Sequence, residues 1–262
     1  MKIRFYKYQG TGNDFILIDN RRLGLPHHTH ELFEKWCSRR FGVGADGLMF
    51  LEEEEAYDFR MVYFNSDGRT SSMCGNGGRC IVKFAHDLGI IGEEANFMAI
   101  DGPHQARITD GIVELKMQDV EGIELMEGDF YLQTGSPHYV RYKKQDIDLI
   151  DLIQEAKSVR YNERFKQEGT NVNLVQDQGD HLQVRTYERG VEDETYSCGT
   201  GVTAVALVNH VCSPSATDYA QKISTKGGDL EVRFHKVNDS SYSEIWLCGP
   251  AEYVFQGELS RI

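Results

Sequence analysis

The sequence predicts an α/β protein in two parts, each rich in strands and each holding one buried central helix. Short segments that alternate apolar and polar residues are spread along the chain and are typical of strands. Two stretches, Arg79–Leu88 and Val202–Val211, are apolar on most helical faces and indicate buried helices. Because each stretch is short for its apolar content, we expect it to run through a surrounding sheet.

The remaining elements follow from the same periodicities. Thr29 is suited to cap a helix that continues to about Phe41, and Asp146–Val159 has the pattern of an amphipathic helix. The alternating segments predicted as strands are Ile3–Tyr8, Phe15–Asp19, Phe59–Phe64, Val113–Met117, Leu182–Tyr187, Leu230–Phe234 and Glu244–Leu247.

One arrangement occurs twice in the chain. A strand, a polar corner, a Cys-Gly-x-Gly turn and an apolar helix are found around Cys74 and again around Cys198, 124 residues later. Self-similarity of this kind indicates two related halves. The charged, glycine-containing stretch Gln118–Gly128 has little apolar pattern, so we predict domains at 1–118 and 119–251.

Composition narrows the class of function. The chain has 262 residues, and 28 basic against 41 acidic side chains give a net charge of −13, which argues against nucleic acid or an anionic membrane as partner. It shows no transmembrane stretch and no signal-peptide pattern, so we expect a cytoplasmic protein with six reduced cysteines. Without a CxxC pair or a phosphate-binding glycine loop, neither a metal site nor a nucleotide cofactor is predicted.

The two Cys-Gly turns suggest a specific chemistry. Glycines before a helix expose backbone N–H groups, which favour a carboxylate, and a cysteine there is favoured as a thiolate. Two such sites facing each other could remove a proton from one face of a carbon and return one to the other face. We therefore predict that Cys74 and Cys198 act on the carbon next to a bound carboxylate. The other cysteines are expected in the core: Cys37, Cys80, Cys212 and Cys248.

Along nearly its full length, the chain resembles the diaminopimelate epimerases, which are amino-acid epimerases that use no pyridoxal cofactor. The matching segments are Gly10-Thr-Gly-Asn-Asp-Phe15, Gly42-Val-Gly-Ala-Asp-Gly47, Phe64-Asn-Ser-Asp-Gly68, Met73-Cys-Gly-Asn-Gly-Gly-Arg-Cys80, Tyr187-Glu-Arg-Gly190, Ser197-Cys-Gly-Thr-Gly201, Lys226-Gly-Gly-Asp-Leu230 and Gly249-Pro-Ala-Glu252. The resemblance implies that each half is a β-barrel-like sheet around its central helix, that 252–262 returns to the first half, and that the protein forms a homodimer.

The resemblance also implies roles for individual residues. Cys74 and Cys198 would be the two acid/base groups, and His138 and Glu188 would tune the pKa values of their thiols. The residues expected to hold the carboxylate at the reacting centre are Gly75, Asn76, Gly199 and Thr200. Those expected to bind the rest of the substrate are Asn13, Gly47, Asn65, Ser136, Asn171, Glu188 and Arg189.

The implied activity is epimerisation of LL-2,6-diaminopimelate to the meso form, for lysine and peptidoglycan precursor synthesis, with no cofactor. Two positions depart from the family pattern. Ser136 stands where many members have asparagine, and some members have glutamine in place of Gly47. These departures leave open a related racemase, for example one acting on histidine. A thiol redox switch using Cys74 and Cys198 is the alternative from another class.

Overall fold

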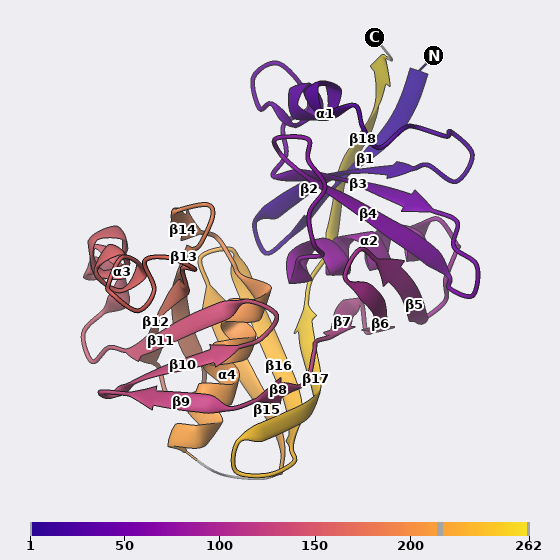
Figure 1. Cartoon of the computed structure of the whole chain (residues 1–262). Helices are drawn as coiled ribbons and strands as arrows, with labels where there is room; N and C mark the ends of the chain where they lie inside the picture. The colour runs from indigo at the N-terminus through magenta and orange to yellow at the C-terminus, as the bar shows by residue number, and fades with distance from the viewer. Residues whose placement is uncertain (1, 214–216, 261–262) are drawn as a thin grey trace. The chain divides into compact units, whose positions relative to one another are not determined.

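The computed structural model describes residues 2–213 and 217–260, which form two compact units. Unit 1 contains the described residues up to Leu115 together with those from Pro250 onward, and unit 2 is Lys116–Gly249. Each unit combines many strands with one central helix (Figure 1). The predicted α/β class with strand-rich halves is therefore confirmed.

In unit 1 the strands follow one another in space as β18–β1–β2–β3–β4–β5–β6–β7. The pairs β2–β3 and β4–β5 are parallel, and the others are antiparallel. The elements of this unit are β1 (Lys2–Gly10), β2 (Asn13–Asp19), α1 (His30–Cys37), β3 (Gly47–Glu52), β4 (Phe59–Asn65), α2 (Gly75–Asp87), β5 (Glu94–Ala99), β6 (Gly102–Thr109), β7 (Ile112–Lys116, which ends at the first residue of unit 2) and β18 (Glu252–Ser260).

Unit 2 has the order β9–β10–β11–β12–β13–β15–β16–β17–β8. Only Gly122 separates β8 from β9, so the pairings return to their start and the sheet closes around α4. The elements are β8 (Val120–Glu121), β9 (Ile123–Met126), β10 (Asp129–Gln133), β11 (Pro137–Tyr142), η1 (Ile147–Leu149), α3 (Leu152–Arg160), β12 (Asn171–Asp177), β13 (Leu182–Glu188), β14 (Asp193–Thr195), α4 (Gly199–Cys212), β15 (Asp218–Thr225), β16 (Gly228–Lys236) and β17 (Ser241–Gly249).

The two units repeat the same topology. A parallel pair joined through a short outer helix occurs as β2–α1–β3 and again as β11–α3–β12. A second parallel pair is joined through the central helix, as β4–α2–β5 and as β13–α4–β15. The position after β4 and the position after β13 thus lead in the same way into a helix that begins next to a cysteine. The repeat predicted from the two Cys-Gly turns is present in the three-dimensional topology.

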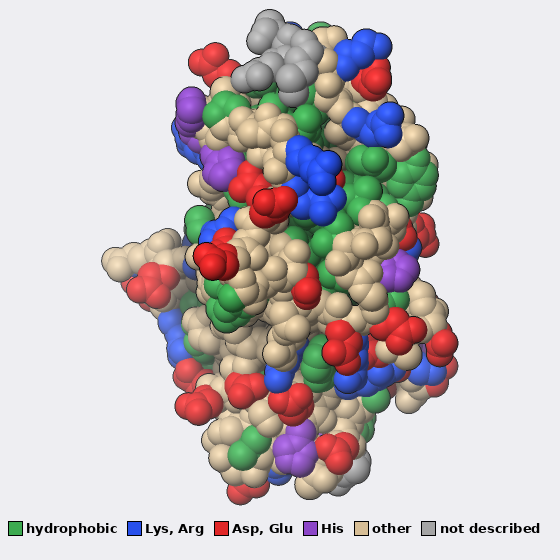
Figure 2. Space-filling view, turned by 90° about the vertical axis from the view of Figure 1, so that its right-hand side faces the viewer, with side chains coloured by type: hydrophobic (Ala, Val, Ile, Leu, Met, Phe, Trp, Pro, Cys, Tyr) green, Lys and Arg blue, Asp and Glu red, His purple; other side chains and the backbone are tan. Residues whose placement is uncertain are grey.

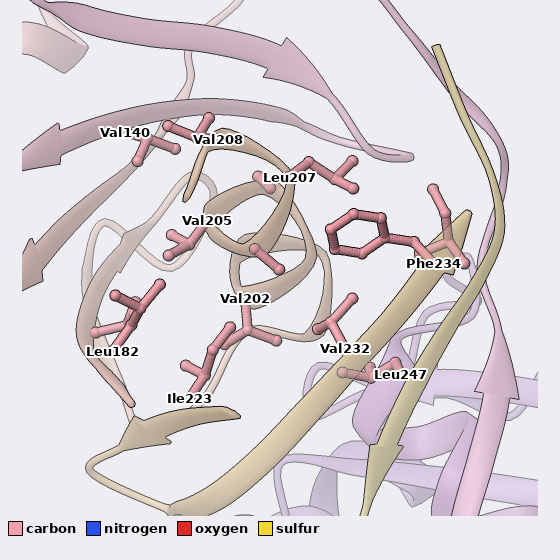
Figure 3. Packing of buried hydrophobic residues seen from close by; sticks show 14 of the residues in the cluster. Val140, Leu182, Val202, Val205, Leu207, Val208, Ile223, Val232, Phe234 and Leu247 are labelled. Carbon is pink, nitrogen blue, oxygen red and sulfur yellow. The ribbon is translucent and has the colours of Figure 1, made fainter. Parts of the chain in front are cut away.

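Both central helices are buried, as their sequences predict. The apolar run of α4 packs against the strands of its own unit, with Val202, Val205 and Leu207 fully buried among the side chains shown in Figure 3. Burying such side chains stabilises each unit by about 1.5–3 kcal/mol per residue. The glycines that open both helices belong to the helices themselves, which begin at Gly75 and Gly199, a turn earlier than the apolar runs indicate.

Three local predictions need correction. The helix that follows Thr29 ends at Cys37 rather than near Phe41, because Ser38 turns to extended backbone, and Thr29 occupies the N-cap position without a capping hydrogen bond from its side chain. The predicted helix over 146–159 is interrupted, because the side chain of Asp151 accepts a hydrogen bond from the N–H of Gln154 and starts a new helix there. Residues 118–128 are not a bare connection, since they contain β8 and β9.

A fourth correction concerns the cysteines expected in the core. Cys37, Cys80 and Cys248 are buried, whereas Cys212 is exposed, because it is the last residue of α4 and lies beyond the enclosing sheet's apolar contacts. On the face shown in Figure 2, acidic and basic side chains are interspersed over the surface.

Candidate active site

Each predicted catalytic cysteine lies at the start of a central helix. Cys74 is the N-cap of α2, with φ −106° and ψ 149°, and its sulfur accepts a hydrogen bond from the N–H of Gly77 at 3.2 Å. Cys198 is the N-cap of α4, with φ −121° and ψ 111°, and its sulfur lies 3.5 Å from the hydroxyl of Thr200. Both sulfurs are thus at the positive end of a helix dipole, which favours a thiolate and an anionic ligand.

Most of the predicted binding residues occupy matching places in the two units. Asn13 begins β2, as Ser136 directly precedes β11. Gly47 pairs with Asn65 across β3 and β4, while Asn171 and Glu188 lie one residue beyond the Val172–Tyr187 pair of β12 and β13. Gly75 and Asn76 follow the first cysteine as Gly199 and Thr200 follow the second. The repeat therefore supplies two similar sets of polar groups, one for each helix start.

In unit 1 a buried arginine orients one of these groups. Arg79 is fully buried, and its Nη2 donates to the side-chain oxygen of Asn76 at 3.0 Å and to the hydroxyl of Thr11 at 3.1 Å. Its Nη1 lies 3.4 Å from the carbonyl oxygen of Gly75. Because Asn76 accepts through its oxygen, the direction of its amide is determined. Arg79 thereby holds the first turn of α2, next to Cys74.

A charge network holds Asn13 in the same unit. The side-chain nitrogen of Asn13 donates to Asp46 at 2.7 Å, and its oxygen lies 4.0 Å from the sulfur of Cys74. Arg39 donates to both Asp46 and Asp14 at 2.7 Å, and the largely buried Lys7 contacts Asp14 at 2.7 Å. Burial alone would raise the pKa of Asp14, but the hydrogen bonds from Arg39 and Lys7 lower it to about 2. Asp14 is therefore an anion throughout the neutral range.

In unit 2, His138 lies below the first turn of α4. It is fully buried, and its Nε2 is 2.9 Å from the hydroxyl of Thr200. Burial, followed by the positive charge of Arg189, lowers the pKa of His138 to about 3. The imidazole is consequently neutral at physiological pH, and the hydroxyl of Thr200 lies between it and the sulfur of Cys198.

Asn171 connects Ser136 with Arg189 in the same unit. Its side-chain nitrogen donates to the hydroxyl of Ser136 at 2.5 Å and to the carbonyl of Pro137 at 3.0 Å, and its oxygen accepts from the N–H of Arg189 at 2.8 Å. Ser136 is therefore held in place although it is not the asparagine common in the family. The guanidinium of Arg189 is exposed and donates to the carbonyl of Glu168 at 2.9 Å.

Three residues that contact the groups near one or the other helix start have no role in the sequence analysis: Thr11 and Arg79 in unit 1, and Asn173 in unit 2. Thr11 and Arg79 lie inside segments that carry the family resemblance, and this position could have marked them as candidate site residues. Asn173 is two residues after Asn171, and the two-residue period of a strand places both side chains on the same face of β12.

Within residues 2–213 and 217–260, no three His, Cys, Asp or Glu side chains come together as a metal site would require. No helix in the described part of the chain is long and apolar enough to cross a membrane.

Comparison with known sequences identifies relatives over the whole chain. The family model for diaminopimelate epimerase matches residues 5–132 and, a second time, residues 130–254. The diaminopimelate epimerase of Flavobacterium psychrophilum is 47% identical over 256 residues, covering 97% of this chain and 99% of that protein. The enzyme of the same name from Chlorobaculum tepidum is 40% identical over 262 residues, covering 96% and 99%.

Comparison with solved structures identifies the fold. A phenazine biosynthesis protein of the PhzF family from Bacillus anthracis superposes with a TM-score of 0.78 at 14% identity, over 100% of both chains. A probable proline racemase from Agrobacterium radiobacter gives 0.70 at 13% identity, covering 98% of this chain and 93% of that chain. At these identities the likeness concerns the fold alone. It agrees with the prediction of two similar halves.

Proposed function

The chain belongs to the diaminopimelate epimerase family, and on this premise we propose that it converts LL-2,6-diaminopimelate to the meso form. The observation that carries the proposal is the repeated helix start, in which Cys74 and Cys198 occupy the same N-cap position. Thiols at such positions can exist as one thiolate and one thiol near neutral pH. An enzyme that inverts a carbon needs one base and one acid of this kind.

In the proposed reaction, one sulfur removes the proton from the α-carbon as a thiolate. The C–H electron pair passes into the adjacent carboxylate, and the other sulfur, as a thiol, returns a proton to the opposite face of the same carbon. Backbone N–H groups near Gly75 and Gly199, with Asn76 and Thr200, stabilise the charge on the carboxylate. The roles of the two sulfurs exchange when the reaction runs in reverse.

The other predicted residues bind the distal part of the substrate. Arg189 is exposed at a strand end and can turn its planar fork toward a carboxylate. Glu188 can pair with an ammonium group, and the amides of Asn13, Asn65 and Asn171 offer donors and acceptors. Ser136 and the backbone at Gly47 complete this set. A substrate without a second charged end would leave such groups unpaired, at about 1–3 kcal/mol each.

We propose further that the protein works without a cofactor, in the cytoplasm, in lysine and peptidoglycan precursor synthesis, with each unit carrying one of the two cysteines. The domains proposed are 1–118 with 252–262, and 119–251.

A homodimer is the proposed assembly. The exposed apolar side chains Tyr253, Val254 and Phe255 on β18 support it, because an apolar strand surface favours contact with a second chain. Light scattering of the purified protein and of Val254→Lys tests the assembly.

The test of activity uses purified protein in heavy water with no added cofactor. Offered LL-diaminopimelate, it should form the meso isomer, and early product should carry solvent deuterium at the inverted carbon while recovered substrate stays largely unlabelled. Cys74→Ala and Cys198→Ala should each stop inversion. Cys212→Ala, which changes an exposed cysteine at the opposite end of α4 from Cys198, is the matched control and should retain activity.

A panel of amino acids with one stereocentre completes the experiment. Comparable turnover of histidine would favour the racemase instead. Absence of any inversion, combined with mass mapping of a Cys74–Cys198 disulfide after mild oxidation, would favour a redox switch. Inversion that survives in either alanine variant would contradict the two-base mechanism.

A further inference from the structure

Behind Cys198, three polar side chains form a continuous row that ends at its sulfur. Nδ2 of Asn173 lies 3.2 Å from Nδ1 of His138, and Nε2 of His138 lies 2.9 Å from the hydroxyl of Thr200. That hydroxyl lies 3.5 Å from the sulfur of Cys198. Asn173 and His138 are both fully buried, so water does not compete for these contacts. The direction of each hydrogen bond can be derived from the other partners of Asn173, the residue farthest from Cys198 in the row.

Two partners determine how the amide of Asn173 is oriented. Its nitrogen lies 3.0 Å from the carbonyl oxygen of Tyr139, which can only accept. Its oxygen lies 2.9 Å from the hydroxyl of Thr186, which can donate. A flipped amide would place two acceptors together at Tyr139. The nitrogen of Asn173 therefore faces His138 and donates to it.

This orientation determines the tautomer of His138. Since Nδ1 accepts from Asn173, it carries no hydrogen, and the neutral ring must carry its hydrogen on Nε2. Burial, aided by the charge of Arg189, keeps the ring neutral by lowering its pKa to about 3. The nitrogen of Asn171 is also 3.4 Å from Nε2, but its two hydrogens have closer acceptors at 2.5 and 3.0 Å. Nε2 therefore donates to Thr200.

We propose that Asn173 is a positioning residue, which holds His138 in the Nε2–H tautomer and so makes the hydroxyl of Thr200 a hydrogen-bond donor to the sulfur of Cys198. Because Thr200 accepts from His138, its own hydrogen is directed to the sulfur, where it stabilises the thiolate. His138 transfers no proton in this arrangement. That this thiolate serves in catalysis rests on the proposed function. The tautomer of His138 and the reactivity of the Cys198 sulfur do not depend on it.

The packing at Gly201 is a second observation that links the row to the first turn of α4. A Cβ at this position would lie 2.6 Å from the side-chain oxygen of Asn173 and 3.3 Å from Cε1 of His138. The first turn of α4 thus leaves space for the row only because residue 201 has no side chain. Asn173 is buried, and moving its side chain away would break its hydrogen bonds to Tyr139 and Thr186.

Unit 1 has no counterpart of the row at the matching strand positions. Phe15 pairs with Gly47 as His138 pairs with Asn171, so Phe15 takes the place of His138 and Met49 that of Asn173. Neither side chain can relay a hydrogen bond. Cys74 is therefore an internal control, present in the same molecule, for every change made behind Cys198.

The first test reads the tautomer directly. In protein labelled with ¹⁵N at histidine, we expect His138 to show a pyrrole-type Nε2 and a pyridine-type Nδ1 that stay unchanged from pH 8 to pH 5. In Asn173→Asp the carboxylate can only accept, so Nδ1 should become the protonated nitrogen. A wild-type ring with its hydrogen on Nδ1, or a charged ring in this pH range, would overturn the proposal.

The second test measures how fast iodoacetamide modifies each cysteine, by peptide mass spectrometry across pH. Asn173→Asp and Thr200→Val should each slow modification of Cys198 near neutral pH by about tenfold, the effect of losing one hydrogen bond to a charged group. Cys74 should react within about twofold of wild type. Thr203→Val, which removes a hydroxyl from the same helix, is the matched control.

Circular dichroism establishes that each variant is folded before its rates are compared. If folded Asn173→Asp and Thr200→Val modify Cys198 at the wild-type rate, Asn173 has no positioning role. Equal slowing of Cys74 and Cys198 would have the same meaning, because it would indicate a general loss of structure. Neither readout requires turnover, so failure of the proposed epimerase activity would be recognised separately.

Discussion

The guanidinium of Arg79, fully buried in α2, donates a hydrogen bond to the side-chain oxygen of Asn76 at 3.0 Å. A cation is seldom buried unless its donors are satisfied, and here the same group also reaches Thr11 and Gly75. These contacts place Arg79 one turn behind Cys74. Arg79 therefore stabilises the start of α2 from inside the protein.

The first prediction concerns this arginine. Arg79→Lys should lower the free energy of unfolding by about 2–4 kcal/mol, because an ammonium group cannot reach all the acceptors of the fork and leaves some of them unpaired. The rate of epimerisation should fall as well, since Asn76 loses its orientation. Urea unfolding and steady-state kinetics measure the two effects. Arg40→Lys, at an exposed arginine of the same unit, should change stability by less than about 0.5 kcal/mol.

A second prediction follows from the lowered pKa of His138, about 3 when folded against 6.5 for the free side chain. Between these values the unfolded chain binds a proton that the folded chain excludes, so stability falls as the pH falls below about 6.5. This residue should contribute a slope of about 1.4 kcal/mol per pH unit.

Unfolding measured between pH 7 and pH 5 should therefore show a shallower pH dependence in His138→Asn than in wild type. Slopes are compared because the substitution also removes hydrogen bonds at every pH. His28→Asn, which replaces an exposed histidine, should keep the wild-type slope. Equal slopes in His138→Asn and wild type would show that the ring is not held neutral.

Asp14 leads to a prediction in a more acidic range. Its pKa is about 2 in the folded protein against 3.8 when free, because the hydrogen bonds from Arg39 and Lys7 outweigh the effect of burial. The stability due to these contacts is present above about pH 4 and is lost as the pH falls toward 2. In Asp14→Asn, acid unfolding should be less steep in this window. Glu93→Gln, at an exposed carboxyl of the same unit, should unfold like wild type.

The space around Gly47 gives a prediction about the family position where some members have glutamine. A Cβ added to Gly47 would lie 2.5 Å from Cε2 of Tyr63 and 2.8 Å from the backbone oxygen of Phe64. Gly47→Ala should therefore destabilise the protein by about 1–3 kcal/mol and raise KM, because the start of β3 must shift. Gly92→Ala, with no atom within 4 Å of the added carbon, should be neutral in thermal unfolding and kinetics.

The thiols in the core should be distinguishable by their reactivity from Cys74, at a helix start, and from the exposed Cys212. Burial raises the pKa of Cys37 to about 12 and raises that of Cys80 further. Neither should form a thiolate at pH 8, so iodoacetamide should modify Cys74 and Cys212 well before either of them. Peptide mapping over time gives the order. Early labelling of Cys80 in folded protein would contradict its place in the core.

Much of the fold was available from the sequence because the relevant signals are local. Alternating apolar residues indicated strands, and the apolar runs after Cys74 and Cys198 indicated the two buried helices, both of which are present. The helix over 146–159 could not be delimited in this way. Periodicity continues through that segment, whereas its break depends on Asp151 capping a new helix.

By itself, the sequence determined the α/β class, the repeated Cys-Gly helix starts and the family, since each depends on residue types at short spacing. Only the tertiary structure decided that Arg79 binds Thr11, that Asp14 pairs with Lys7 and Arg39, and that Asn173 orients His138. These partners come from different strands and helices. Their contacts exist because strand pairing and helix burial bring distant residues together in a region without water, where the direction of each hydrogen bond is determined by its neighbours.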